Sequence, residues 1–266
     1  MMNLIQSDLY KLRKSKAIKI LFLIMWVAAA VVALVSYLVA QGKIDQELSG
    51  PLSGLTDIMM VAIVGPFLAG VYICGDFDNK TIHDAISSCG ISRIVVIISK
   101  AIVYYLIVML MLVPYAVVTL IAFATGAEFS QPFAASVFLS ILANENGLDL
   151  TPLVFGKMLV IMIVMLLVYA SEMTVCVLLS FLFRKSSLVI FTGFGLILVL
   201  QILGGLGSKS DVVNNILSYT PFSIGSSVLT MDADTDVILK ALGVSLLFCV
   251  WFLSITNGIF RKSEVK

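Results

Sequence analysis

IVVIISKAIVYYLIVMLMLVPYAVVTLIAFAT, residues 94–125, is the stretch that decides the fold class of this chain. After Lys100 it contains no charged residue, and it exceeds the roughly 20 residues that a helix needs to cross a hydrocarbon core of about 30 Å. Lipid offers no hydrogen-bond partner to an exposed backbone, so an uninterrupted apolar run of this length indicates a transmembrane helix. The polar and apolar alternation of a barrel strand is absent.

Five further apolar stretches lie before and after this one, each long enough to cross a membrane. They are residues 18–40, 55–74, 158–183, 186–208 and 241–260. The composition agrees, because 60% of the residues are hydrophobic, 12% are charged and the mean hydropathy is +1.10, far from the ordinary soluble range. We therefore predict an all-α, polytopic membrane protein with six transmembrane helices in a single domain.

The basic residues collect on alternate polar breaks. Most of the 17 Lys and Arg residues lie before the first span, between the second and third, between the fourth and fifth, or after the sixth. By the positive-inside rule these segments are cytoplasmic, and so are both termini. Before the first span, Leu4, Ile5, Leu9 and Leu12 recur at helical spacing, which predicts an amphipathic helix along the cytoplasmic membrane surface. A plain basic topology signal is the alternative.

The most informative polar break is GDFDNKTIHDAISSCGISR, residues 75–93. Thr81 with Asp84 three residues later resembles a helix-starting box, and Gly90 is a plausible stop, so we expect a short helix between them. Apolar positions share one face of this helix at i, i+3, i+4 and i+7, namely Ile82, Ala85, Ile86 and Cys89. Such a face is suited to docking in the groove of a partner, and a solvated loop that reverses the chain is the alternative.

The order of these features resembles the ABC type-2 transporter permeases. An amphipathic N-terminal helix and two spans are followed by Asp-Asn-Lys-Thr-Ile at 78–82, Ile-Ser-Arg at 91–93, Lys100 at the start of the third span, and further spans. The chain is similar to small bacterial permeases for drug, bacitracin or lantibiotic export and immunity, over nearly its whole length. The resemblance implies a location in the bacterial cytoplasmic membrane and export as the direction of transport.

The resemblance also implies that residues 76–93 form a coupling helix that contacts a separate cytoplasmic ATP-binding subunit. The contact or hinge candidates are Asp76, Asp78, Lys80, Thr81, Ile82, His83 and Arg93, and Ile86 belongs to the apolar docking face. The chain has no G-x-x-x-x-G-K-[ST] phosphate loop. We therefore expect ATP and Mg²⁺ on the partner, and no catalytic residue, metal site or cofactor on this chain. Six spans resemble half of a transport pathway, which implies pairing with a second copy or a paralogue; no nucleic acid is expected as a partner.

One ionisable residue, Glu172, lies inside a span, about 12 residues from the basic boundary at Arg184. An unpaired charge this deep is expensive, so it must face protein, water or a proton. Glu172, with Ser171 and Thr174, either lines the translocation path or forms hydrogen bonds that join helices. The sequence leaves both interpretations open.

The outer segments are residues 126–152 and 209–236, both poor in basic residues. An acidic vestibule would favour cationic or amphipathic cargo, although outer loops are often simply poor in Lys and Arg. In the second segment, residues 216–224 are apolar but too short and too Pro-broken to cross the membrane, and they resemble a re-entrant segment. Ile216, Tyr219 and Phe222 are candidates for an outer gate, or alternatively for interfacial anchors.

The leading hypothesis is an ABC exporter permease for an amphipathic peptide, drug or lipid-like compound. The alternatives are a cation-coupled secondary transporter that uses Glu172, and a membrane scaffold or sensor that transports nothing. The predicted segments are 1–17 (interfacial helix), 18–75 (spans 1 and 2), 76–93 (coupling segment), 94–125 (span 3), 126–152 (outer loop), 153–208 (spans 4 and 5), 209–236 (outer or re-entrant segment) and 237–260 (span 6).

Overall fold

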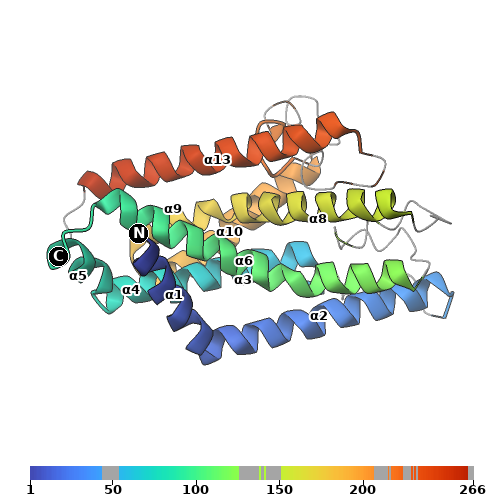
Figure 1. Ribbon diagram of the computed structural model, residues 1–266, viewed down its shortest axis with the longest axis horizontal. Helices are drawn as coiled ribbons and strands as arrows, with labels where there is room; N and C mark the ends of the chain where they lie inside the picture. The colour runs from blue at the N-terminus through green and yellow to red at the C-terminus, as the bar shows by residue number, and fades with distance from the viewer. Residues whose placement is uncertain are drawn as a thin grey trace.

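The computed structural model describes residues 1–43, 54–125, 138, 141, 151–206, 215, 217–223, 229, 231 and 233–262. Helices and their connections account for these residues, and no β-strand occurs among them. The described part of the chain holds 6 helical segments long and apolar enough to cross a membrane. Figure 1 shows them side by side in an elongated bundle. The predicted all-α, polytopic membrane fold is confirmed.

Each span corresponds to one helix or to helices that follow directly on one another. They are α2 (Lys16–Ala40), α3, η2 and α4 (Asp57–Ala69, Gly70–Cys74 and Gly75–Asp78), α6 (Arg93–Ala124), α8 and α9 (Pro152–Glu172 and Thr174–Phe183), α10 (Ser186–Leu206) and α13 (Thr235–Lys262). Two shorter helices, α1 (Met2–Lys14) and α5 (Thr81–Ser87), complete the described elements. The interfacial and coupling helices expected from the sequence are therefore both present as helices.

The fourth span begins at Pro152, next to the predicted segment boundary at 153 and before the apolar stretch that starts at 158. The hydroxyl of Thr151 accepts a hydrogen bond from the Val154 N–H at 3.4 Å, and Pro152 occupies the first turn, two features that favour a helix start. Lys157, in these added turns, donates a hydrogen bond to the carbonyl of Met231. The added turns of the helix therefore contain no unpartnered ammonium group.

Helix α1 lies across one end of the bundle and meets α2 at a steep angle (Figure 1). Extended backbone at Ser15, with φ −65° and ψ 122°, produces the bend. Helix α5 and the last turn of α13 lie at this same end, which we call the terminal end. The positive-inside rule predicts that the terminal end is cytoplasmic.

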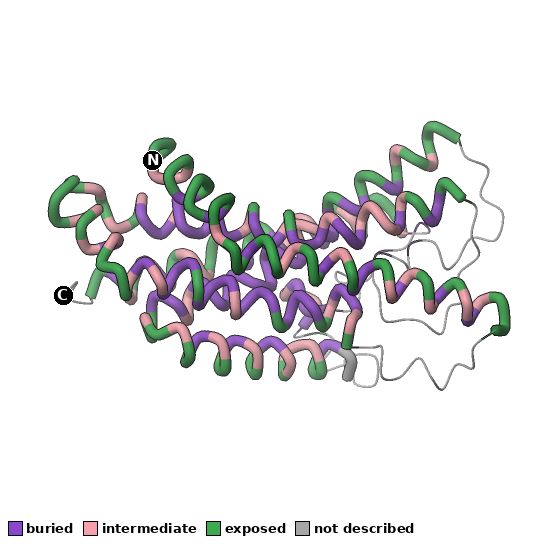
Figure 2. Tube along the Cα trace, turned by 90° about the horizontal axis from the view of Figure 1, so that it is seen from below, coloured by how far each residue is buried: buried purple, intermediate pink, exposed green. Residues whose placement is uncertain are grey.

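Helix α6 is the centre of the packing. It contacts α1, α2, α3, α8 and α13, and its large side chains Tyr104, Met111 and Leu112 are fully buried. Figure 2 shows the buried residues as a continuous interior along the bundle. Outward faces of α2, α10 and α13 carry exposed apolar side chains such as Leu23, Phe191 and Leu247, as expected for surfaces that contact lipid.

The second span changes from α-helix to a π-helical turn, η2, near the terminal end. The Ser186 hydroxyl donates a hydrogen bond to the Gly70 carbonyl at 2.8 Å, and a Cβ at Gly70 would lie 3.1 Å from the Ser186 carbonyl oxygen. Glycine at this position therefore allows α10 to begin directly against the second span. Turns of the π type occur frequently at functional sites, and this one leads directly into the segment 76–93.

Candidate functional site

A buried cluster of charged side chains joins three elements at the terminal end. Lys100 of α6 is only 6% exposed, and its ammonium group donates to Asp8 of α1 at 2.8 Å and to Asp76 of α4. Asp8 also accepts a hydrogen bond from the Tyr72 hydroxyl at 2.8 Å. Lys11 of α1 forms an ion pair with the second oxygen of Asp76 at 3.3 Å. We call these five residues the ionic cluster.

The ionic cluster balances its formal charges, with two carboxylates and two ammonium groups. Its buried members satisfy one another by hydrogen bonds, which is the condition under which charges tolerate burial. Asp8 is 3% exposed, while the neighbouring Leu9 is 39% exposed. The pairing of Asp8 with Lys100 therefore outweighs the preference of its carboxylate for water.

The segment 76–93 begins at this cluster. The hydroxyl of Thr81 donates to the backbone carbonyl of Asp76 at 3.0 Å, and Lys80 adopts the left-handed conformation, with φ 58°. Helix α5 then runs from Thr81 to Ser87 and has no side-chain cap. The expected capping box is therefore absent, because Thr81 bonds to the preceding turn instead. Gly90, with φ +62°, stands after the helix as predicted.

The apolar face of α5 packs inward. Ile82 is 1% exposed, and Ile86 is half-buried against the core. The expectation that Ile82 projects as a docking knob needs correction, because its side chain already fills the chain's own interior. The exposed residues of the segment lie on other faces and include Asp78, Lys80, Asp84, Ser87 and Ser88, while His83 is half-buried.

Arg93, the last residue of the segment, links it to the sixth span. Its guanidinium donates to the backbone carbonyls of Phe260 and Arg261 at 2.8 and 2.9 Å, and it lies 5.6 Å from the centre of the Phe260 ring. Carbonyls at the end of a helix have no intrahelical partner, so Arg93 satisfies the C-terminus of α13. The segment is thus attached to α1 and α6 at its start and to α13 at its end.

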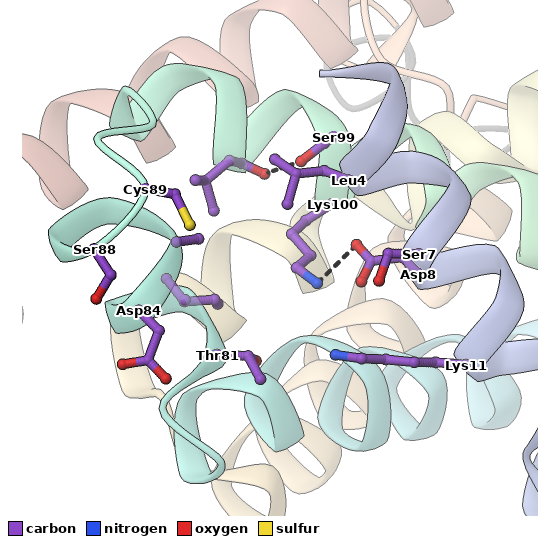
Figure 3. A pocket seen from close by; sticks show the side chains of 13 residues that line it. Leu4, Ser7, Asp8, Lys11, Thr81, Asp84, Ser88, Cys89, Ser99 and Lys100 are labelled. Carbon is purple, nitrogen blue, oxygen red and sulfur yellow. Dashed lines mark hydrogen bonds and ion pairs between the residues drawn. The ribbon is translucent and has the colours of Figure 1, made fainter.

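A cavity of about 300 Å³ lies between α1 and α5, and the first turns of α6 form its third side. Figure 3 shows Lys100 and Asp8 on one side of this cavity, and Asp84, Ser88 and Cys89 on the other. Leu4 and Ile82 contribute apolar surface to it. The space lies beside the ionic cluster and next to the exposed face of α5.

Glu172, Ser171 and Thr174 do not form one polar group. The Ser171 hydroxyl donates to the carbonyl of Val168 at 2.7 Å within its own helix. The Thr174 hydroxyl lies 2.9 Å from the Tyr105 hydroxyl and 3.3 Å from the Cys249 sulfur, so it joins α9 to α6 and α13. Glu172 is 2% exposed at the join of α8 and α9, and its Oε2 has no hydrogen-bond partner among the described residues.

The outer-gate candidates have different environments. Phe222 is 4% exposed and packs with Val175 and Phe248, whereas Tyr219 is 78% exposed. Ile216 lies outside the described residues. Phe222 therefore reaches the interior of the bundle, and Tyr219 does not.

Sequence reasoning missed Asp8, Tyr72 and Lys100 as members of one cluster. Lys100 was counted only as a basic residue at the start of a span. It stands between Ser99 and Ala101 in an otherwise apolar stretch, and that placement is the signal that it needs a buried partner. The identity of the partners depends on packing between elements far apart in the sequence.

The comparisons with known proteins agree with this architecture. A family model described as ABC-2 family transporter protein matches residues 4–145, which include α1, the first three spans and the segment 76–93. Among curated proteins no match is found. The match covers more than half of the 266 residues. This chain therefore belongs to the ABC-2 transporter family, as a multi-pass membrane permease of an ABC transporter.

Proposed function

We propose that this chain is the membrane subunit of an ATP-driven exporter for an amphipathic compound, such as an antimicrobial peptide, a drug or a lipid-like molecule. It works in the bacterial cytoplasmic membrane with a separate cytoplasmic ATP-binding subunit, which binds ATP and Mg²⁺. A second copy of the chain, or a paralogue, completes the pathway.

The attachment of the segment 76–93 is the observation that carries the proposal. Asp76 ties its start to α1 and α6 through Lys100, and Arg93 ties its end to α13. A displacement of α5 by a partner protein is therefore transmitted to α1, α6 and α13 together. Such a lever is what a permease requires if the energy is supplied by another protein.

The ATP-binding subunit contacts the solvent-exposed face of α5 on the cytoplasmic side, where Asp84 has 68% of its side chain exposed. Lys80, Ser87 and Ser88 are exposed beside it. Ile82 and Asp76 are buried and attach α5 to the rest of the chain. This division assigns binding to the exposed residues and transmission to the buried ones.

Co-purification with a cytoplasmic ATP-binding subunit of an ABC transporter from the same organism tests the proposal. Asp84→Lys changes an exposed position of α5 and Ser88→Arg an exposed position directly after it, and we expect both to abolish co-purification while the chain still inserts in the membrane. Lys262→Asp, an exposed position at the end of α13, is the matched control and should leave the complex intact. Ile82→Asp is unsuitable here, because it places a charge in the core.

The same preparation separates the alternatives. Transport by the chain alone, driven by a cation gradient, would establish the secondary transporter. A complex that forms normally but moves no amphipathic compound in proteoliposomes with ATP would favour the scaffold. Unchanged co-purification of both α5 variants would contradict the assigned contact.

A further inference from the structure

The bend between α1 and α2 carries a set of exposed cations. Basic side chains flank Ser15, two at the end of α1 and two at the start of α2, namely Arg13, Lys14, Lys16 and Lys19. None of them forms an ion pair with a residue of the described chain. We call these four residues the basic bend. Their charges are available to something outside the described part of the chain.

Several other basic residues at the terminal end are engaged within the protein. Lys11 and Lys100 belong to the ionic cluster. Arg93 donates to the carbonyls at the end of α13, and the Arg184 guanidinium lies 5.4 Å from the centre of the Phe77 ring. Internal pairing therefore explains these positions but not the basic bend. A cluster of Lys and Arg directly before a transmembrane helix is typical of segments that bind anionic lipids.

An exposed apolar surface on α2 begins directly beside the basic bend. Ile20, Leu23 and Val27 are 58%, 65% and 58% exposed, and we call them the apolar track. Positions three, four and seven residues apart share a helix face, so Lys16 and Lys19 lie on the face that the apolar track continues. Helix α2 is long and apolar enough to cross a membrane. One face of α2 thus presents ammonium groups at the level of lipid headgroups and apolar side chains at the level of acyl chains.

Helix α1 adds an interfacial surface on the other side of the bend. It meets α2 at a steep angle across the terminal end (Figure 1). Leu9 and Tyr10 are 39% and 60% exposed, and the Lys14 ammonium lies 4.6 Å from the centre of the Tyr10 ring. Exposed apolar and aromatic side chains beside basic ones are typical of a helix at a membrane surface. The bend therefore brings basic residues of two helices to the same membrane surface.

We propose that the basic bend binds an anionic phospholipid, whose phosphate contacts Lys16 and Lys19 and whose acyl chain lies along the apolar track. Arg13 and Lys14 add positive charge from α1. The apolar track favours a lipid over a free phosphate ion and over an acidic protein surface, because neither of these would cover apolar side chains inside the membrane. Binding needs neither ATP nor the ATP-binding subunit, so this proposal is independent of the proposed function.

Tryptophan quenching by brominated lipid tests this site, because Trp26 lies beside it. Trp26 is seven residues after Lys19 and three after Leu23, so it shares their helix face. The chain contains 2 tryptophans, and Trp251→Phe, at an exposed position of α13, leaves Trp26 as the sole reporter. The full chain is placed in phosphatidylcholine nanodiscs with a small fraction of dibrominated phosphatidylglycerol, or the same fraction of dibrominated phosphatidylcholine. We expect the anionic lipid to quench Trp26 more strongly, and salt to reduce the difference.

Substitutions in the same single-tryptophan background locate the effect. Lys16→Gln with Lys19→Gln should reduce the preference for phosphatidylglycerol by roughly fivefold per lysine, the effect of one basic residue near an anionic membrane surface. Lys16→Arg with Lys19→Arg retains the charge and should retain the preference. Arg261→Gln with Lys262→Gln is the matched control, since both residues are exposed at the terminal end but share their helix face with Gly258 instead of an apolar track. The control should quench as the native chain does.

Equal quenching of Trp26 by the two brominated lipids in the chain with its native basic residues overturns the proposal. A loss in the Arg261 and Lys262 control as large as in the Lys16 and Lys19 glutamine variant also overturns it, because the preference would then follow total charge. If that glutamine variant is not monodisperse, native preference in Lys19→Gln alone decides against the site. Absence of lipid preference, together with lost co-purification of the glutamine variant with the ATP-binding subunit, would identify the bend as a protein contact instead.

Discussion

The ionic cluster and the bundle interior around α8, α9 and α10 both bury polar groups, but they satisfy them differently. Lys100 makes contacts with two carboxylates, and each of those carboxylates has a further partner, Tyr72 or Lys11. Glu172 and Gln201 have unpartnered atoms among the described residues. A complete set of partners fixes elements to one another, whereas an incomplete set can accept a ligand. Substitutions in the two regions should therefore affect stability in opposite ways.

The largest expected effect follows from Lys100→Met. The substitution leaves Asp8 and Asp76 buried beside each other without their shared cation, and removal of one partner from a buried ion pair destabilises proteins by about 3 to 5 kcal/mol. We expect a strong decrease in the thermal unfolding midpoint in detergent, together with loss of the α1 contact. Protease cleavage near Ser15 measures that loss.

The double variant Lys100→Met with Asp8→Asn provides the control. It leaves Asp76 to pair with Lys11 and removes the second carboxylate, so part of the lost stability should return. If the double variant is no more stable than Lys100→Met, the charge balance of the ionic cluster is not what holds α1 in place.

Much of this fold is predictable because the signals are local. Apolar length alone predicts the spans, and Gly90 predicts the end of α5. Helix α8 begins at Pro152, before the apolar stretch that starts at 158, and Lys157 in the added turns is satisfied by the distant Met231 carbonyl. Local signals thus fail where a charged side chain has a partner far away in the sequence.

The candidate site was predictable only in part, for the same reason. Residues 76–93 stand out by their polarity, and Asp76 and Arg93 do anchor that segment. The helical spacing of Ile82 and Ile86 correctly groups them on one face, but periodicity does not specify whether that face meets a partner or the chain's own core. Glu172 was recognisable as a buried acid, whereas the lack of a hydrogen-bond partner for its Oε2 depends on how the described helices pack around it.

A smaller effect is expected for Tyr72→Phe, which removes one hydrogen bond from Asp8 without altering charge. Hydrogen bonds to charged groups contribute about 1.5 to 3 kcal/mol, and Lys100 still pairs with Asp8 in the variant. We expect a moderate decrease in the unfolding midpoint, clearly less than for Lys100→Met. A decrease of equal size would mean that Tyr72, and not the ion pair, is the principal partner of Asp8.

Thr174→Val should have a still smaller effect. It removes the hydroxyl that contacts Tyr105 and Cys249 and nearly preserves the side-chain volume. Hydrogen bonds between membrane helices average about 0.6 kcal/mol in double-mutant cycles. The unfolding midpoint should change slightly, and a double-mutant cycle with Tyr105→Phe should give a coupling of this order. A coupling of several kcal/mol would place Thr174 among the fixed contacts, alongside the ionic cluster.

The smallest effect on stability, and the sharpest contrast, is expected for Glu172→Gln in the absence of any ligand. The native carboxyl has an unpartnered oxygen and no ion pair in the described chain, so the substitution breaks no stabilising charge interaction. An amide is also less expensive than a carboxylate to keep in a membrane interior. We therefore expect the free energy of unfolding to stay within about 0.5 kcal/mol of the native value or to increase. A loss comparable to that of Lys100→Met would show that Glu172 is a structural residue with a partner of its own, and the difference between the two regions would disappear.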